Sequence, residues 1–296
     1  MAAFVLASCT PELVLTYDGT STAPIQTAVV NADGLDRYQY LSTAGSMAVG
    51  TFPDNDSSNL RTVFWPSSVP VVADSQSCAT WTRQSGPFVQ QGAAFRIRRS
   101  NGRVQAITVT KNVWLGANWG FNFHTWDTAR SGPPSQHFGG KEIPGLRAGD
   151  RAVAFPWHFC ARVLNGAIEF KVWTNGMAEP AWGDPNWSGK GTIPAGWEAP
   201  GTTGWYIGHL APGDTARFDD LRTWRYQAAP PPTTTTTTKP PTSTTTTIAP
   251  STTAPTTSTT EPTTTTSSAA QASGLVATAA GSEADGAVEV RGGPAA

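Results

Sequence analysis

Beyond Gln227 the sequence has no aromatic residue, although the chain of 296 residues contains 12 Trp, 12 Phe and 5 Tyr. A segment without aromatic residues and with few aliphatic ones cannot bury enough apolar surface to offset the entropy of ordering its backbone. We therefore expect one globular domain over residues 12–227, followed by a disordered extension. A domain of this length is typical of a single all-β sandwich or barrel.

The domain also lacks a concentrated charge of either sign. Residues 1–227 hold 18 Lys and Arg against 17 Asp and Glu, and no basic run is longer than Arg98-Arg99. A phosphate backbone is bound through a concentrated positive field, so nucleic acid is not an expected partner. No apolar stretch approaches the roughly 18–20 residues of a membrane span. The sequence also lacks the spacings typical of zinc, nucleotide and acyl-transfer sites.

Cysteine is scarce, with Cys9, Cys78 and Cys160 as the whole set. Cys78 and Cys160 fall inside strand-like runs, which favours one disulfide between them; two buried free cysteines are the alternative. Cys9 follows Leu6-Ala7-Ser8, and this run resembles the bacterial lipobox, in which the cysteine becomes lipid-modified. The apolar run is short and no Lys or Arg precedes it, so residues 1–11 are either the remnant of an export signal or an accidental match.

Thr and Pro dominate the segment after the domain. They occupy 29 of the 37 positions from Pro230 to Thr266. Such composition predicts a semi-rigid spacer over residues 228–266, either an O-glycosylated stalk or an unmodified tail. Residues 267–296 are rich in small residues, and we expect them to be disordered. The spacer and the expected disulfide together favour a secreted or cell-surface protein.

Alternating apolar and polar residues predict strands within the domain, for example over residues 61–65, 94–98, 104–109, 161–164 and 168–173. Asn101-Gly102 and Asn165-Gly166 separate such runs, and Asn-Gly is typical of the type I′ turn of a β-hairpin. No window sustains a helical period. The predicted fold is therefore an antiparallel two-sheet β-sandwich.

The last third of the domain carries a recognisable order of features: the hairpin Cys160–Trp173, then Glu179-Pro180 and Trp182, and finally Phe218-Asp219-Asp220. This order resembles the concanavalin A-like lectin/glucanase superfamily, in its laminin-G-like bacterial branch. The resemblance is specific over residues 160–226 and topological before that. It implies a jelly roll whose concave sheet often binds glycans, without implying catalysis.

The same resemblance implies a candidate structural Ca²⁺ site that joins the two ends of the domain. Asp18 near the first strand and Asp219 or Asp220 in the last strand are the candidate ligands. Calcium takes 6–8 oxygen ligands, of which the sequence indicates only two or three. Asp54-x-Asp56 also resembles the start of a calcium loop, but it lacks the required Gly and Glu, so we interpret it as a solvated turn.

The segment around residues 121–127 is the most informative for function. In a strand, Phe121, Phe123 and Thr125 point to one side, and the side chains on the other side are those of Asn122, His124 and Trp126. Amide, imidazole and indole groups suit a sugar, and we predict that these three residues bind carbohydrate. The alternative is that Trp126 packs in a second layer. Trp187 and Trp197 in the Gly/Pro-rich loops are further candidate carbohydrate-binding residues.

Glycan-cleaving members of the superfamily carry acidic residues at i, i+2 on one strand, and this spacing occurs in the domain only at Asp54 and Asp56. We therefore predict a monomeric, non-catalytic module that binds a polysaccharide or glycan. A hydrolase or lyase using Glu142, Glu179 or Glu198 is the alternative, as is a structural or adhesive surface domain.

Overall fold

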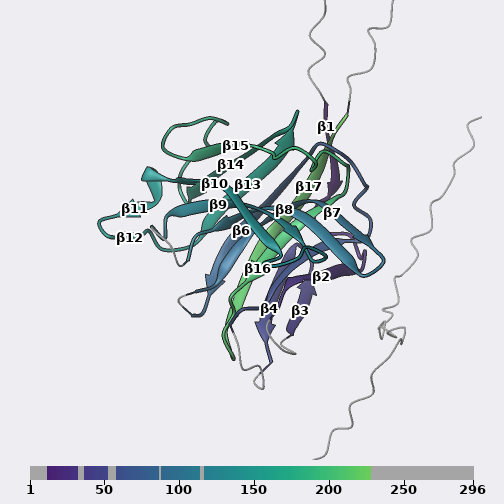
Figure 1. The fold of residues 1–296 in the computed structure, drawn as a ribbon. Coiled ribbons are helices and arrows are strands. Elements are labelled where there is room, and N and C mark those ends of the chain that lie inside the picture. Colours follow the sequence, from purple (N-terminus) through teal and green to yellow (C-terminus); the bar gives the residue numbers. More distant parts are fainter. Residues whose placement is uncertain (1–11, 33–36, 53–57, 87, 114–116, 228–296) are drawn as a thin grey trace, which may run out of the picture. The chain divides into compact units, whose positions relative to one another are not determined.

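The structure, a computed structural model, describes residues 12–32, 37–52, 58–86, 88–113 and 117–227. These residues form an antiparallel β-sandwich, which confirms the predicted fold class (Figure 1). One layer is a seven-stranded sheet in the order β10 (Ser135–Glu142), β9 (Gly120–Asp127), β8 (Arg103–Lys111), β7 (Gln90–Ser100), β16 (Thr202–Gly208), β5 (Arg61–Pro66) and β2 (Ile25–Asn31).

The second layer is an eight-stranded sheet. Its order is β15 (Ser188–Thr192), β14 (Ala167–Thr174), β13 (Trp157–Leu164), β6 (Ser75–Gln84), β17 (Thr215–Gln227), β4 (Ser46–Thr51) and β3 (Tyr38–Thr43), with β1 (Glu12–Tyr17) paired to β17. A two-stranded ribbon of β11 (Arg147–Ala148) and β12 (Arg151–Ala152) follows a single 3₁₀ turn, Pro144–Leu146. None of the described residues forms a helix with the length and hydropathy of a membrane span.

The main core lies between the two sheets and is rich in aromatic rings. Phe121 and Phe123 of β9 are at most 1% exposed and stack or tilt against rings of the facing sheet, including Phe170 at centroid distances of 4.6 and 5.8 Å. Aromatic pairs at such distances stabilise a core beyond the burial of their area. The sequence interpretation of Phe121, Phe123 and Thr125 as the inward-facing set is therefore correct.

Asn-Gly pairs make the two hairpins that the sequence predicts. Asn101 and Gly102 have φ of 49° and 76° and join β7 to β8, while Asn165 and Gly166 have φ of 52° and 76° and join β13 to β14. Positive φ at both central residues defines the type I′ turn, whose twist matches that of antiparallel strands.

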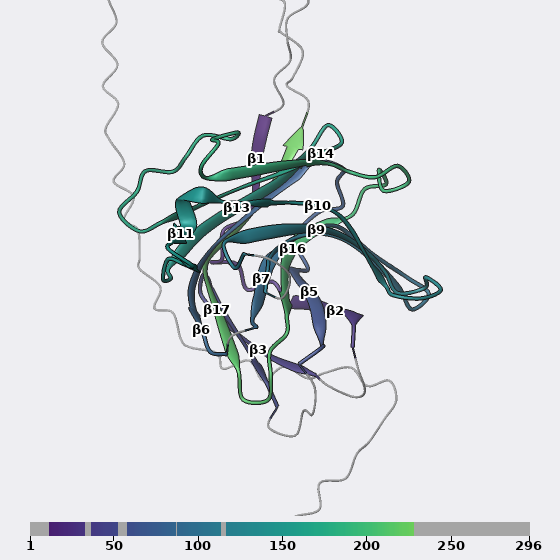
Figure 2. The ribbon, with the colours of Figure 1, turned by 60° about the vertical axis from the view of Figure 1, so that its left-hand side comes forward.

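The seven-stranded sheet curls strongly, so that its outer face is concave. Strands β7, β16, β5 and β2 follow one another in the sheet (Figure 2). Strand β2 nevertheless contacts β8, which lies on the far side of β7. This curl buries a second apolar cluster on the concave face, separate from the main core: Ala28, Val30, Val63, Trp65, Ala94, Ile97, Val104, Ala106, Trp126 and Tyr206.

The predicted disulfide between Cys78 and Cys160 is present. The two cysteines lie opposite each other on the adjacent strands β6 and β13. Their neighbours Ala79, Phe159 and Ala161 belong to the core, so the cysteine side chains point to the outer face of the eight-stranded sheet. The disulfide therefore ties two neighbouring strands of one sheet rather than the two layers.

Candidate functional site

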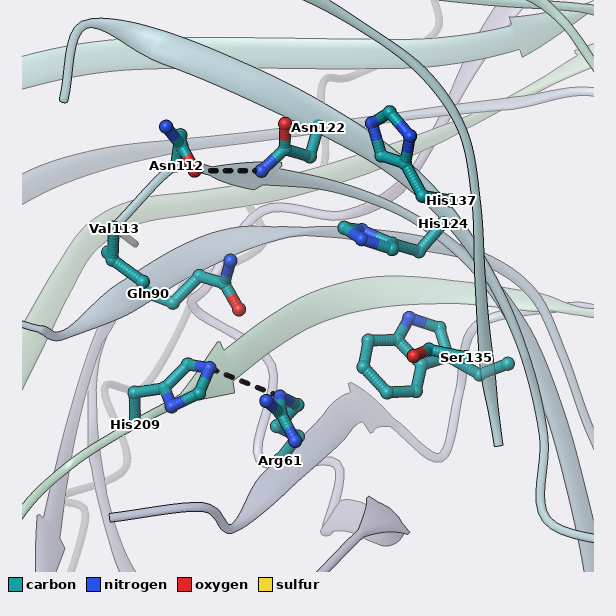
Figure 3. Close-up of a pocket in the computed structure, with 10 residues that line it drawn as sticks. Arg61, Gln90, Asn112, Val113, Asn122, His124, Ser135, His137 and His209 are labelled. Atoms are coloured by element: carbon teal, nitrogen blue, oxygen red, sulfur yellow. Dashed lines mark hydrogen bonds between the residues drawn. The ribbon is translucent and has the colours of Figure 1, made fainter. Parts of the chain in front are cut away.

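A cavity of about 480 Å³ opens on the concave face of the seven-stranded sheet (Figure 3). Side chains from four strands (β5, β7, β9 and β10) and from the segments that follow β8 and β16 line it: Arg61, Gln90, Asn112, Val113, Asn122, His124, Trp126, Ser135, His137 and His209. Its volume falls within the range of about 300–1,000 Å³ that is typical of small-molecule sites.

Trp126 forms the floor of the cavity, and Tyr206, which does not line the cavity, packs against it. Trp126 and Tyr206 lie 5.8 Å apart between ring centroids, and both are buried, Trp126 with 3% of its surface exposed. The indole N–H donates to the Thr108 hydroxyl at 2.9 Å, and the Tyr206 hydroxyl donates to Gln90 at 2.7 Å. These hydrogen bonds fix the orientation of both rings, so the floor is pre-organised.

Arg61 and His209 form one wall. The Arg61 Nε–H donates to His209 Nε2 at 3.2 Å, and His209 Nδ1 lies 3.0 Å from the Ser58 carbonyl, to which it donates (Figure 3). This arrangement requires the neutral imidazole, with the proton on Nδ1. Burial, together with the nearby Arg61 charge, lowers the pKa of His209 to about 4. Arg61 also lies over the Trp126 ring at 5.9 Å.

His124 and His137 form the opposite wall, on the paired strands β9 and β10. Their ring centroids are 5.3 Å apart, and His124 lies 5.7 Å from Trp126. Burial lowers the pKa of His124 to about 4, with smaller contributions from His137 and Arg61. The buried Nδ1 of His124 has no hydrogen-bond partner among the described residues, whereas His137 is exposed at the rim.

Amide groups complete the lining. Asn122 Nδ2 donates to Asn112 Oδ1 at 3.1 Å, and the Asn112 amide N–H donates to the Ala117 carbonyl at 3.1 Å. Gln90 accepts from Tyr206, which leaves its NH₂ group as a donor near the cavity. The cavity therefore combines hydrogen-bond donors and acceptors with flat aromatic surface.

The three residues predicted from strand alternation, Asn122, His124 and Trp126, all line this cavity. The curl of the sheet packs Trp126 into the concave-face cluster, which agrees with the alternative that it packs in a second layer, and its role in carbohydrate binding stays a prediction. The sequence prediction missed Arg61 and His209. Arg61 shares a face with Val63 and Trp65 by the same alternation, whereas His209 follows the end of β16 and carries no such signal.

The loop tryptophans lie elsewhere, and neither lines the cavity. Trp187 packs on Gly145, where a Cβ atom would collide with the indole, and contacts the main core. Trp197 also contacts the core, and its carbonyl accepts from the guanidinium of the buried Arg96 at 2.6 Å. Both rings are half-buried and anchor loops, so their role in carbohydrate binding remains a prediction that the geometry does not favour.

The structure brings the first and last strands together, as the calcium prediction requires, but not a set of calcium ligands. Asp219 accepts hydrogen bonds from Ser46, from Thr82 at 2.8 Å and from Arg217 at 3.0 Å. Asp220 accepts from Thr80, while Asp18 is exposed and accepts from Thr20.

Among the described residues no group of three His, Cys, Asp or Glu side chains is placed to hold a metal. Both oxygens of Asp219 are already engaged, one of them by a cation. Asp219 as it stands does not fit a calcium site, because the Arg217 guanidinium already binds its Oδ1.

The glutamates considered for catalysis do not line the cavity. Glu179 forms an ion pair with Lys171 at 2.7 Å, and Glu198 accepts from the Gly196 amide at 3.0 Å. Glu142 ends β10 opposite Gly120. Cys9, the pair Asp54 and Asp56, the spacer 228–266 and the tail 267–296 lie outside the described residues.

Comparisons with known proteins give no match to a family model or to a curated protein. Solved structures with a similar fold include a carbohydrate-binding module, CBM66, from Bacillus subtilis, with 10% identity and a TM-score of 0.41 over 67% of this chain and 94% of that one. They also include the exoplasmic/lumenal domain of VIP36 with bound Ca²⁺, at 7% identity and a TM-score of 0.44 over 73% and 91% of the two chains.

A third similar structure is a prokaryotic β-1,3-1,4-glucanase derived from a mouse hindgut metagenome. It has 8% identity and a TM-score of 0.39, and the match covers 73% of this chain and 99% of that one. Similarity of this order does not extend the ligand or the activity of any of these proteins to this chain.

Proposed function

We propose that the domain is a non-catalytic carbohydrate-binding module and that the concave-face cavity is its binding site. The observation that carries this proposal is the composition of the cavity. The Trp126 indole lies at the floor of a space of about 480 Å³ that amide, imidazole and guanidinium groups surround. Sugars present both flat C–H faces and hydroxyl groups, so they need both kinds of surface in one place.

The floor and the walls of the cavity contact different parts of the sugar in this proposal. Trp126 and Tyr206 are fixed by hydrogen bonds to Thr108 and Gln90, so ligand binding does not have to order them. Pre-organised groups lose little entropy on binding. Asn122, His124 and His137 on β9 and β10 carry the polar atoms that meet the hydroxyl groups of the sugar.

Binding without cleavage is supported by the chemistry of the cavity lining. Glycoside hydrolysis generally uses a pair of carboxyl groups about 5–10 Å apart. The described lining contributes no Asp or Glu side chain.

The proposal extends to a secreted or cell-surface location. A disulfide between Cys78 and Cys160 is typical of an oxidising compartment. The Thr- and Pro-rich composition of residues 228–266 fits a stalk that holds the domain away from its attachment point. The resemblance of residues 160–226 to the concanavalin A-like superfamily also supports a glycan-binding role on a concave sheet.

A blocking variant tests the site. Ser135 lies on β10 and lines the cavity, so Ser135→Trp should fill part of it, while Ser131→Trp places the same side chain on the exposed β9–β10 turn. We expect the native domain and Ser131→Trp to be retained equally in affinity gels that contain a polysaccharide ligand. Ser135→Trp should lose at least about 10-fold in affinity, the effect of about 1.4 kcal/mol.

A panel of neutral and acidic polysaccharides supplies the ligands, and release of reducing ends is measured in parallel. Retention without reducing ends supports the module. Equal retention of Ser135→Trp and Ser131→Trp would move the site away from the cavity. Release of reducing ends would overturn the non-catalytic assignment, and no retention on any polysaccharide would contradict the binding function.

A further inference from the structure

The ionisable side chains in the described lining of the concave-face cavity are all basic. Its described lining holds the Arg61 guanidinium and three histidines, and it holds no carboxylate. Several other cations do have an acidic partner, among them Arg103 with Asp127, Arg162 with Glu169 and Arg217 with Asp219. Within the described residues no carboxylate lies within ion-pair distance of Arg61.

We propose that the cavity selects a sugar that carries an anionic group, a carboxylate or a sulfate, and that Arg61 binds this group. The inference rests on the proposed carbohydrate-binding function and names the class of sugar. The guanidinium is a planar fork of N–H donors that matches carboxylate and sulfate oxygens, and a charge-assisted pair of this kind fixes both position and orientation.

The geometry around Arg61 supports this role because its described partners hold it without neutralising it. His209 accepts from Nε at 3.2 Å, and the Asn59 carbonyl lies 3.4 Å from one terminal nitrogen. Neither partner carries a charge, because His209 accepts through Nε2, which therefore has no proton, and donates only through Nδ1 to the Ser58 carbonyl. His209 therefore positions the guanidinium while its positive charge remains available to a ligand.

Burial makes an uncompensated cation costly, because a charged group that leaves water needs a partner of opposite sign. Arg61 is half-buried on the floor side of the cavity, 5.9 Å from the centre of the Trp126 ring. Contact with an aromatic face compensates only part of this cost. An anionic ligand would supply the missing charge.

His124 and His137 extend the same preference to the opposite wall. The Nδ1 of His124 is buried without a partner among the described residues. The ionisable groups that face this ring are His137 on β10 and Arg61 on β5, both of them basic. An anion in the cavity would favour the protonated imidazole and pair with it, which couples ligand binding to proton uptake.

The test uses polysaccharides that differ only in charge. Polygalacturonate is compared with its methyl ester, which tests the carboxylate, and carrageenan with its desulfated form, which tests the sulfate. Dissociation constants are measured by calorimetry on the full chain at fixed ionic strength. We expect one of the charged polymers to bind at least about 10-fold more tightly than its neutral counterpart, the range of one charge-assisted hydrogen bond.

Two substitutions test whether Arg61 causes the tighter binding of the charged polymer. Arg61→Gln should remove about 10- to 100-fold of the affinity for the charged polymer, and Arg61→Lys should restore part of it because the positive charge returns. Arg217→Gln removes the same charge from the opposite face of the domain and should change the affinity less than about 2-fold. His137 is exposed at the rim, so His137→Gln should fold normally, and the preference for the charged polymer should weaken in this variant too.

Proton uptake gives an independent measure. If one histidine becomes protonated on binding, affinity for the charged polymer should rise up to about 10-fold per unit as the pH falls from 6.5 to 5.5, and affinity for the neutral ester should not change. The rise in affinity for the charged polymer as the pH falls should be smaller in His124→Gln.

The outcomes separate this inference from the proposed function. Equal affinity for charged and neutral polymers, with loss of both in Ser135→Trp, would overturn the anionic class and leave the carbohydrate site standing. Preference for the charged polymer that survives in Arg61→Gln and His137→Gln would show general electrostatic attraction and would also overturn it. Failure of every polymer to bind would remove the proposed function and the inference together.

Discussion

The outer faces of the two sheets differ in how their charged side chains are paired. On the eight-stranded sheet, Glu169 lies between Arg162 and Lys190 with ion-pair distances of 2.5 and 2.9 Å, and Lys171 pairs with Glu179. On the concave face of the seven-stranded sheet, basic groups gather around a cavity whose described lining has no acid. Paired charges stabilise a surface that has no further partner, whereas an unpaired basic cluster is suited to binding an anion.

The aromatic rings of the two faces also differ in their surroundings. Trp182, which follows β14, lies between two cations, with Arg162 at 4.2 Å and Lys171 at 4.6 Å from the centre of its ring. Trp126 on the concave face contacts Tyr206 and one arginine at 5.9 Å, and it forms the floor of the cavity. Trp182 is half-buried among charged side chains, whereas Trp126 is buried at the floor of a cavity.

The largest expected effect concerns the disulfide on the outer face of the eight-stranded sheet. We call this face the paired face, because Glu169 and Lys171 form ion pairs on it. The cysteines are 82 residues apart in sequence, and in the chain-entropy model a loop of this size stabilises the folded state by about 4–5 kcal/mol. Replacing both Cys78 and Cys160 with Ser should lower the free energy of unfolding in urea by this amount. Thiol titration of the denatured, unreduced protein should find one reactive cysteine, Cys9, and three free thiols would contradict the disulfide.

A pair of tryptophan variants sharpens the comparison between the faces. Trp126→Ala empties a buried site and should lower the free energy of unfolding by about 3–5 kcal/mol, as Phe123→Ala should in the main core. Trp173→Ala on the paired face removes a half-buried ring stacked on His158 and should cost about 1 kcal/mol or less. Equal losses in the two tryptophan variants would contradict the burial difference between the faces.

Much of the fold could be predicted because it depends on local patterns. Asn101-Gly102 and Asn165-Gly166 specify turns by their own backbone preference, and alternation over residues 121–127 separates the two faces of β9 correctly. The burial of Trp126 could not be predicted in this way. It depends on the curl that brings β2 into contact with β8, and this contact is a property of the whole sheet rather than of any one strand.

The candidate site was predictable only in part for the same reason. Asn122, His124 and Trp126 share one strand, so one pattern finds all three. Arg61 and His209 reach the cavity from β5 and from the segment after β16, and only the order of strands in the sheet places them opposite β9. The calcium prediction placed the first and last strands together correctly, but it could not show that Arg217 already pairs with Asp219.

A smaller effect is expected from the ion pairs of the paired face. Burial opposes ionisation of Glu169, but hydrogen bonds from Lys190 and Arg162 outweigh it, and the pKa of this carboxyl is lowered. Glu169→Gln should therefore lower the free energy of unfolding at pH 7 by about 1–2 kcal/mol, because two cations lose their partner. The effect should shrink in 1 M NaCl, and polysaccharide binding at the concave face should not change.

The smallest effect is a difference in the pH range over which the two faces lose their contribution to the free energy of unfolding. The folded-state pKa of His124 and His209 is about 4, whereas the ordinary histidine value is 6.5. Between these values the unfolded chain binds more protons than the folded one, so the free energy of unfolding decreases as the pH falls from 6.5 towards 4. Each histidine contributes at most about 1.4 kcal/mol per pH unit in this window.

The paired face responds at lower pH. The pKa values of Glu169 and Asp219 are lowered, so the stability that these carboxylates contribute is present above about pH 4.5 and is lost only as the pH falls through their folded-state values. Urea unfolding at pH 6.5 and 5.5 therefore isolates the concave face. Wild type should lose about 1 kcal/mol more than His124→Gln over this interval, while Glu169→Gln should follow wild type. A loss as large in His124→Gln as in wild type would mean that the pKa of His124 is the same in the folded protein as in the unfolded chain. His124 would then take up its proton near pH 6.5 before any ligand binds, and little proton uptake would be left to couple to ligand binding at pH 5.5.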